Sequence, residues 1–146
     1  LIDLVDPSNE RIAKLYSVEF YRSIPKILTR DGIFTTQASS TFFTPDAFST
    51  IHSTIKHALP AFQTKPIGIN VPSFGEWGFV LASRDSIDFS EAKLPKSLEY
   101  LTPQELTFSE TNRQIVSLQS SRKKPSTLLS PRVIYEYKRN MAQWSY

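Results

Sequence analysis

The stretch LIDLVDP, residues 1–7, decides the fold of this chain. Its apolar start runs into two acids three residues apart and then a proline, as a buried strand does where it turns into a loop. A strand of this kind needs neighbours in a sheet, and no polar lead-in precedes Leu1. We therefore expect residues 1–5 to end a central strand, in a fold whose earlier part lies upstream of this chain.

The composition limits the class of protein. A chain of 146 residues is long enough for one domain with an appendage. Cysteine is absent, which removes disulfides and thiolate metal sites and fits the cytoplasm. The longest apolar run, FVLA at 79–82, is far shorter than the ~20 residues that span a bilayer, so we expect no membrane contact by this segment. The basic cluster 122–124 has no interleaved aromatic residues, so we expect no nucleic-acid partner and interpret it as a mobile connector.

The residues after Pro7 have helical periodicity. Apolar residues recur three and four positions apart, which predicts one helix from about Asn9 to Leu28 with a single buried face, kinked or ended early at Pro25. The buried positions would be Ile12, Leu15, Tyr16, Phe20, Ile24, Ile27 and Leu28. Gly32 follows near the end of the helix, and the β-branched and aromatic stretch IFTTQA, residues 33–38, is typical of a strand.

A second helix and a hairpin follow. Thr44 as the N-cap and Pro45 at the first helical position predict a helix to about Leu59. Its buried face would hold Phe48, Ile51, Ile55 and Leu59. PIGINVP, residues 66–72, and WGFVLAS, residues 77–83, indicate two strands of an antiparallel hairpin. Alternating strands and helices predict an α/β fold, with a mainly parallel sheet that ends in this hairpin.

The character of the sequence changes after Ser83. We expect residues 1–84 to form a partial catalytic domain and residues 85–146 to form a C-terminal extension with short helices and a linker. In the extension, TPQEL at 102–106 indicates a helix start, and 131–144 can form an amphipathic segment. The candidate anchors of that segment are Val133, Tyr137 and Trp144.

Few residues can carry chemistry. The four glycines form no phosphate-binding loop, so this chain alone is expected to bind no nucleotide cofactor. His52 and His57 would lie on different faces of a helix, so we interpret both as structural or surface residues and expect no metal site. Asp3 and Asp6 lie at the carboxyl end of a strand, where α/β sheets bind ligands. Two carboxylates there could hold an ammonium group, and one could take its proton.

The spacing of the two acids leaves an alternative open. Asp6 or Ser8 could cap the following helix, and Asp3 could simply end a strand. Because two acids three residues apart are short and common as a motif, this structural interpretation is favoured on spacing alone.

Four motifs read together favour a functional interpretation. In this order they resemble the polyamine aminopropyltransferases, the spermidine synthase family: DLVDP (3–7), LYSVEFY (15–21), DGIFTTQASS (31–40) and NVPSFGEWGFVLAS (70–83). The likeness extends into the tail, where YLTPQEL (100–106) and RVIYEYKRNMAQW (132–144) are similar to bacterial members that carry an additional membrane-spanning region. The resemblance implies the C-terminal half of a Rossmann-like class I methyltransferase fold, with residues 1–5 as the end of its fourth strand.

The resemblance also implies an activity and a set of residues. The family transfers an aminopropyl group from its co-substrate, decarboxylated S-adenosylmethionine, to putrescine or a similar diamine. Asp3 matches the family's catalytic proton acceptor, and Asp6 matches its partner in holding the diamine. Gln37 corresponds to a glutamine beside the diamine, and an ordinary hydrogen bond at the end of a strand is its alternative role. Phe74 stands where many members carry a tyrosine. Glu10 replaces a frequent proline of the thionucleoside pocket.

Two other functions stay open. One is a methyltransferase-like enzyme that uses S-adenosylmethionine itself, and the other is a degenerate, non-catalytic interaction module, which Glu10 and Phe74 would favour. As a fragment the chain is expected to be inactive, because it lacks a glycine-rich nucleotide loop. An unpaired strand at residues 1–5 would favour a homodimer. The parent protein is expected in the cytoplasm or anchored at the cytoplasmic face of the membrane.

Overall fold

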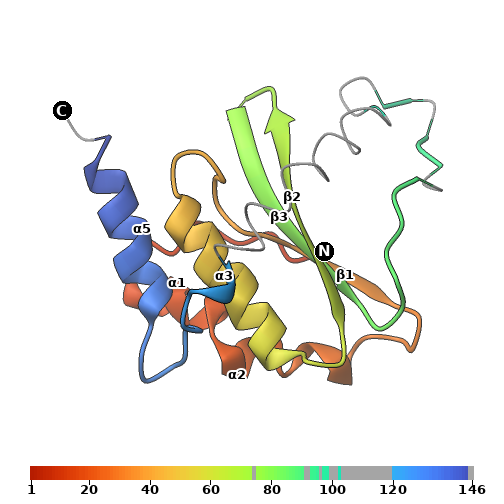
Figure 1. The fold of residues 1–146 in the computed structure, drawn as a ribbon, viewed down its shortest axis with the longest axis horizontal. Coiled ribbons are helices and arrows are strands. Elements are labelled where there is room, and N and C mark those ends of the chain that lie inside the picture. The colour runs from red at the N-terminus through yellow and green to blue at the C-terminus, as the bar shows by residue number, and fades with distance from the viewer. Residues whose placement is uncertain (74, 91–92, 96, 99–101, 103–119, 145–146) are drawn as a thin grey trace.

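A computed structural model describes residues 1–73, 75–90, 93–95, 97–98, 102 and 120–144. Figure 1 shows α3 and α5 side by side and the start of the chain beside β1. In chain order the elements are α1 (Glu10–Ala13), η1 (Lys14–Tyr16), α2 (Val18–Tyr21), η2 (Ile24–Lys26), β1 (Ile33–Gln37), α3 (Pro45–Ala58), β2 (Gln63–Val71), β3 (Gly75–Ser83) and α5 (Arg132–Ala142).

The three strands form one sheet in the order β1-β3-β2. Strand β3 pairs antiparallel with both neighbours, with Val80 opposite Thr36 of β1 and opposite Pro66 of β2. The predicted strand at 33–38 and the predicted hairpin are confirmed. The expected mainly parallel pairing is absent among the described strands, because β3 returns between β1 and β2 and therefore runs opposite to each of them.

Parallel pairing is present at the start of the chain. Ile2 forms a parallel bridge with Thr36, in which the Ile2 amide donates to the Thr35 carbonyl at 2.7 Å and the Gln37 amide donates to the Ile2 carbonyl at 3.1 Å. Residues 1–5 therefore lie against β1 as the sequence predicts for a strand end, although the pairing is limited to this bridge.

The single helix predicted over 9–28 is wrong. The chain instead forms four short pieces, α1, η1, α2 and η2. Ser17 has extended backbone angles, and its side chain accepts a hydrogen bond from the Phe20 amide. The Val18 amide donates to the carbonyl of Ser126 at 2.9 Å, so a partner far along the chain replaces the helical one. The interruption at Ser17 changes which side chains face the core.

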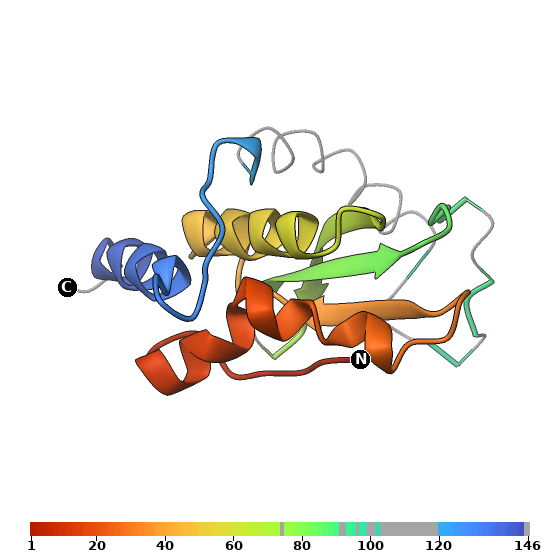
Figure 2. The ribbon, with the colours of Figure 1, turned by 90° about the horizontal axis from the view of Figure 1, so that it is seen from below.

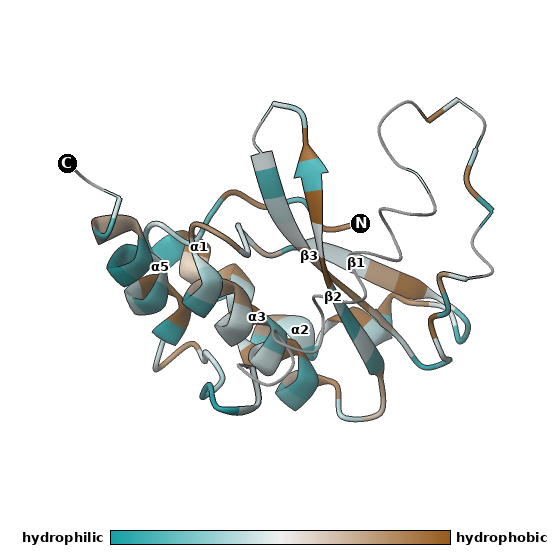
Figure 3. Ribbon diagram, turned by 45° about the horizontal axis from the view of Figure 1, so that its top comes forward, coloured by the Kyte–Doolittle hydropathy of each residue, from teal (hydrophilic) through white to brown (hydrophobic). Residues whose placement is uncertain are grey.

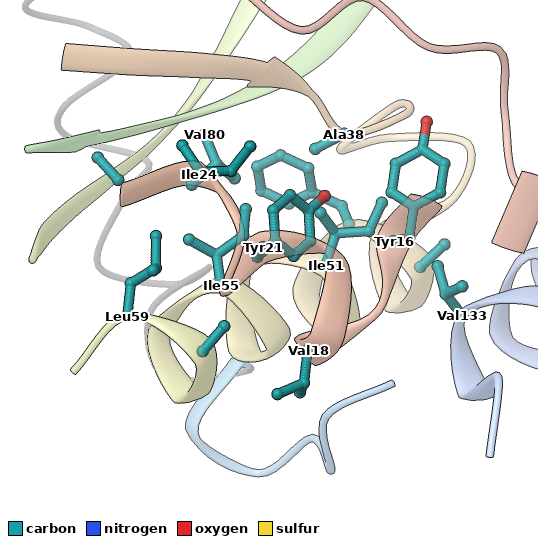
Figure 4. Close-up of a cluster of buried hydrophobic side chains, with 14 of the residues drawn as sticks. Tyr16, Val18, Tyr21, Ile24, Ala38, Ile51, Ile55, Leu59, Val80 and Val133 are labelled. Atoms are coloured by element: carbon teal, nitrogen blue, oxygen red, sulfur yellow. The ribbon is translucent and has the colours of Figure 1, made fainter. Parts of the chain in front are cut away.

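The interruption at Ser17 changes which side chains of residues 9–28 are buried. Tyr16, Tyr21 and Ile24 are buried, whereas Leu15 and Ile27, which the helical pattern placed in the core, are 37% and 84% exposed. The short pieces lie beside α3 (Figure 2), and Figure 4 shows the buried side chains of Tyr21, Ile55 and Val80 gathered between the helices and the sheet. The short pieces and α3 thus form one helical layer on one face of the sheet.

Helix α3 begins and ends as predicted, and its four expected core residues are buried. Its amino end is capped differently, because the Thr44 side chain binds the Ser40 carbonyl instead of the helix amides. The amides of Asp46 and Ala47 donate to Oδ1 of Asn140 on α5, at 3.0 and 3.4 Å. A residue of the tail therefore caps this helix.

The tail is bound to the rest of the fold. Val133 and Ile134 of α5 are buried in the core cluster, while hydrophilic residues alternate with hydrophobic ones along the helix (Figure 3). Lys123 and Arg139 bind the carboxylate of Asp46 at 2.6 and 2.7 Å. The interpretation of 122–124 as a mobile connector is therefore wrong at Lys123, since the sequence carries no signal for an acid on a distant helix.

Two further predictions concern helices. His52 is a structural histidine as predicted: its ring nitrogens are each 2.9 Å from a hydroxyl, of Ser120 and of Thr64. The helix start expected at 102–106 falls outside the described residues, apart from Thr102. None of the helices in the described part of the chain is long and apolar enough to cross a membrane.

Candidate functional site

A pocket of about 300 Å³ lies between the first residues of the chain and the sheet. Trp77 and Phe79 alternate along β3 with the buried Gly78 and Val80, so their side chains lie on the face of the sheet opposite α3. Asp3 and Gln37 supply the polar side chains of the pocket. Among the described residues, the lining is Leu1, Ile2, Asp3, Leu4, Gln37, Val71, Trp77 and Phe79.

Gln37 is the most connected of these residues. Its side-chain nitrogen donates to the Leu4 carbonyl at 2.5 Å and to the Tyr16 hydroxyl at 2.9 Å. Its side-chain oxygen accepts from the Ser39 amide at 2.5 Å and from the Trp77 indole nitrogen at 3.2 Å. Gln37 is 3% exposed, so these bonds form away from water and each is costly to break.

Tyr16 extends this network on the core side. Its hydroxyl donates to the Val5 carbonyl at 3.0 Å while it accepts from Gln37. Burial, aided by the charges of Asp6 and Asp3 and by nearby tyrosines, raises the pKa of Tyr16 above its usual range, so the phenol stays protonated. The backbone of the segment that carries Asp3 is thus held at Ile2, Leu4 and Val5.

The two acids of the opening motif lie in different surroundings. Asp3 is exposed and lines the pocket. Asp6 is not part of the lining; its Oδ2 accepts a hydrogen bond from the Tyr137 hydroxyl of α5 at 3.2 Å. Burial and the charge of Asp6 raise the pKa of Tyr137 to about 12, so this phenol is a donor at all ordinary pH values.

The two remaining predicted site residues are Glu10 and Phe74. Glu10 is the exposed first residue of α1 and does not line the pocket. Phe74 falls outside the described residues. Asp3 and Gln37 therefore line the pocket together, whereas Asp6 and Glu10 are not part of its lining. Within the described part of the chain, no three His, Cys, Asp or Glu side chains are grouped to hold a metal ion.

A carboxylate next to Trp77 fixes the loop that follows β1. Glu76 accepts hydrogen bonds from the hydroxyls of Thr41 and Ser40 and from the amide of Phe42. Burial raises the pKa of Glu76, and these bonds only partly oppose that effect.

The sequence predicted Tyr16 as a buried residue and Tyr137 as an anchor, but it did not predict their hydrogen bonds. A tyrosine that binds a distant group has no local signature.

Gly78 shows how closely this loop approaches the sheet. A Cβ added there would lie 2.4 Å from the Phe48 ring and 2.7 Å from the Ser39 carbonyl. The Gly78 amide donates to that carbonyl at 2.7 Å. Only glycine permits this contact, which places Ser39, with a positive φ of 68°, at the end of β1.

Comparison with known proteins identifies the fold and the family. Two solved structures of spermidine synthase, one from Thermotoga maritima and one in complex with the transition-state analogue AdoDATO, superpose with a TM-score of 0.59 at 22% identity. Each match covers 75% of this chain and 40% of the solved chain. The fold is therefore the predicted α/β class, the methyltransferase-like fold of these enzymes.

Sequence matches place the chain within a family. Residues 1–91 match the spermine/spermidine synthase domain. Polyamine aminopropyltransferase 2 of Aquifex aeolicus is 38% identical over 138 residues, which are 94% of this chain and 27% of the relative. Polyamine aminopropyltransferase of Oceanobacillus iheyensis is 36% identical over 143 residues, 95% of this chain and 27% of the relative. The chain belongs to the spermine/spermidine synthase family and spans about a quarter of the length of these curated relatives.

Proposed function

We propose that this chain supplies the diamine-binding and proton-accepting part of a polyamine aminopropyltransferase. The observation that carries the proposal is the position of Asp3, whose exposed carboxylate lines a pocket otherwise walled mainly by apolar side chains. Apolar walls suit the methylene chain of a diamine, and the carboxylate suits one of its ammonium groups. The relatives' names support the same reaction.

The reaction needs a base at this position. A diamine nitrogen with a pKa of about 10 is protonated in neutral water and has no lone pair with which to attack carbon. After the nitrogen transfers a proton to Asp3, it attacks the aminopropyl carbon bound to the sulfonium of decarboxylated S-adenosylmethionine. The carbon–sulfur bond breaks, its electron pair returns to sulfur, and methylthioadenosine leaves as a neutral thioether. The carboxyl group of Asp3 then releases its proton to solvent.

The roles of the remaining predicted residues are part of the proposal. Asp6, held by Tyr137, would bind the distal ammonium group of putrescine or a similar diamine. Contacts of Glu10 and Phe74 to the donor and the diamine stay predictions from the family pattern. A cytoplasmic location and a homodimer likewise stay predictions from the sequence.

A hybrid enzyme tests the proposed function. The hybrid is the Aquifex aeolicus relative with its matching segment replaced by this chain, a replacement guided by 138 aligned residues. We expect the hybrid to convert putrescine and decarboxylated S-adenosylmethionine to spermidine and methylthioadenosine, measured by chromatography. The 146-residue chain alone is expected to show no transfer, because its sequence has no glycine-rich nucleotide loop.

The unmodified relative and a folding measurement serve as controls. Circular dichroism and thermal unfolding establish that the hybrid folds as the relative does. A folded hybrid without transfer activity, beside an active unmodified relative, would contradict the proposed function and favour a non-catalytic module.

A further inference from the structure

We propose that Gln37 positions the catalytic segment by binding the backbone on both sides of Asp3, and that it does not contact the diamine. This inference rests on the proposed function only for the role of Asp3. The family resemblance places a glutamine at this position beside the diamine, so the two roles make different predictions.

The hydrogen bonds of the Gln37 amide are all used within the protein. A glutamine side chain has two N–H donors and one oxygen with two lone pairs. The donors go to the Leu4 carbonyl and the Tyr16 hydroxyl, and the oxygen accepts from Ser39 and Trp77. A diamine ammonium group, which can only donate, would have to displace one of the two donors that already bind the oxygen.

Gln37 binds the chain immediately before and after Asp3. Its backbone amide donates to the Ile2 carbonyl at 3.1 Å, and its side chain donates to the Leu4 carbonyl at 2.5 Å. A single residue thus binds the peptide group that precedes Asp3 and the carbonyl of the residue that follows it. The aspartate side chain has few rotamers. Because the backbone around Asp3 is fixed by these hydrogen bonds, the Asp3 oxygens can occupy only a few positions in the pocket.

The same side chain also fixes the opposite wall of the pocket. The Trp77 indole nitrogen donates to Gln37 Oε1 at 3.2 Å, and Trp77 lines the pocket that Asp3 enters. Gln37 therefore sets the spacing between the base and an apolar wall. A misplacement of about 1 Å in such a site can lower the rate by roughly 10²-fold, which is why a residue that touches no substrate could matter.

Hydrogen exchange of the 146-residue chain tests whether Gln37 holds residues 1–5 in place. This measurement needs no enzymatic activity. Gln37→Glu keeps the acceptor for Ser39 and Trp77 but loses both donors at neutral pH. We expect the Ile2 and Gln37 amides, which join residues 1–5 to β1, to exchange roughly tenfold faster in the variant, as local opening becomes easier. Gln63→Glu makes the same change at an exposed site on β2 and should leave both amides unchanged.

A second variant covers the case in which the buried charge prevents folding. Tyr16→Phe keeps the amide of Gln37 and removes the hydroxyl that bridges it to the Val5 carbonyl. It should accelerate exchange of the same two amides by a smaller factor. Unchanged exchange in a folded Gln37→Glu chain, or in Tyr16→Phe if Gln37→Glu does not fold, would overturn the positioning role.

Kinetics of the hybrid enzyme distinguish the two roles of Gln37. A positioning role predicts that Gln37→Glu lowers kcat by roughly 10²-fold with little change in KM for putrescine. A diamine contact predicts a raised KM together with unchanged exchange in the chain, and this result would overturn the inference. An inactive parent hybrid would contradict only the proposed function, because the exchange measurement still decides whether Gln37 holds residues 1–5.

Discussion

Asp3 and Asp6 are three residues apart, and the structure places them in two different regions. Asp3 belongs to the pocket region, where its carboxylate is exposed beside Gln37 and Trp77. Asp6 belongs to the tail region, the residues that contact α5 and the segment before it, where it binds Tyr137. The surroundings, and not the spacing of the motif, therefore distinguish the two acids: the Asp3 carboxylate is exposed in a pocket, whereas Asp6 accepts a hydrogen bond from another side chain.

The two regions also differ in how their polar groups are satisfied. In the pocket region, neutral hydrogen bonds centred on Gln37 hold the backbone, and no described residue supplies a counter-charge to Asp3. In the tail region, Asp46 of α3 binds two cations and the Asn140 amide, so its charge is neutralised within the protein. Substitution of Asp3 should therefore change the rate, and substitution of Asp46 should change mainly the stability.

The largest effect is expected at Asp3. Asp3→Asn in the hybrid enzyme keeps the shape of the side chain but removes the proton acceptor. General base catalysis contributes ~10²–10⁴-fold, so kcat should fall by a factor in that range with a smaller change in KM for putrescine. The loss should ease as pH rises and more diamine is already deprotonated. Asp31→Asn, at an exposed acid before β1, is the control, and near-normal turnover of Asp3→Asn would remove the difference between the two acids.

The next effect concerns pH and His52, which joins α3 to β2 and to Ser120. Burial, with a smaller contribution from the charge of Lys56, lowers the pKa of His52 from 6.5 to about 4. The unfolded chain therefore binds a proton before the folded chain does, and stability falls as pH decreases from about 6.5 to 4. The loss should reach roughly 3 kcal/mol in urea unfolding of the 146-residue chain.

Variants of the two histidines test this assignment. His52→Asn should remove most of the slope between pH 6.5 and 4, whereas His57→Asn, at an exposed site on the same helix, should preserve it. A slope that survives in folded His52→Asn would assign the pH dependence to another group.

A smaller effect is expected at Asp46 in the tail region. Burial alone would raise the pKa of Asp46, but hydrogen bonds from Lys123, Arg139 and Asn140 outweigh it and lower the pKa from 3.8 to about 2. The associated stability is present above pH 3.8 and is lost as pH falls through 2. Because the ion pairs are partly exposed, Asp46→Asn should cost roughly 1 kcal/mol near pH 7, measured by urea unfolding. If the difference in unfolding free energy between the unmodified chain and Asp46→Asn grew below pH 3, the hydrogen bonds of the Asp46 carboxylate would not be the source of this stability.

The smallest effect is expected at Tyr137, whose hydroxyl binds Asp6. Tyr137→Phe removes one hydrogen bond to Asp6, worth about 1 kcal/mol, and should raise KM for putrescine in the hybrid severalfold with little change in kcat. Asp6→Asn should also raise KM, and the double variant should be less than additive because both changes weaken the same charge-assisted contact between residues 6 and 137. Tyr135→Phe, at an exposed tyrosine of the same helix, should have no effect. Additive losses would show that Tyr137 does not act through Asp6.

Local patterns predicted much of the fold. Helix α3 and the hairpin follow from apolar periodicity and turn residues, and their boundaries lie near those expected. The prediction of one long helix at 9–28 was wrong because the same apolar periodicity is compatible with several short helices separated by an extended residue, Ser17. The bond between the Val18 amide and Ser126 joins residues too far apart for any local pattern to predict.

In the candidate site, too, the sequence predicted individual residues but not the contacts between residues far apart in the chain. The order of the motifs assigned Asp3 and Gln37 to the candidate site, and both line the pocket, while their roles stay predictions. Tyr16 was expected as a core residue of a helix, which accounts for its burial but not for its hydroxyl bonds. The contact between Tyr137 and Asp6 spans nearly the whole chain, so only the tertiary structure can reveal it.

The cap that Asn140 places on α3 has a consequence for the order in which the chain folds during synthesis. A ribosome makes the α3 residues well before Asn140, at roughly 5–20 residues per second, so the amides of Asp46 and Ala47 must wait several seconds for their acceptor. During that interval only water can accept hydrogen bonds from these two amides, and the helix is stabilised by the burial of its apolar face alone. A run of slowly translated codons between α3 and α5 would lengthen the time during which α3, not yet covered by α5, is exposed to chaperones.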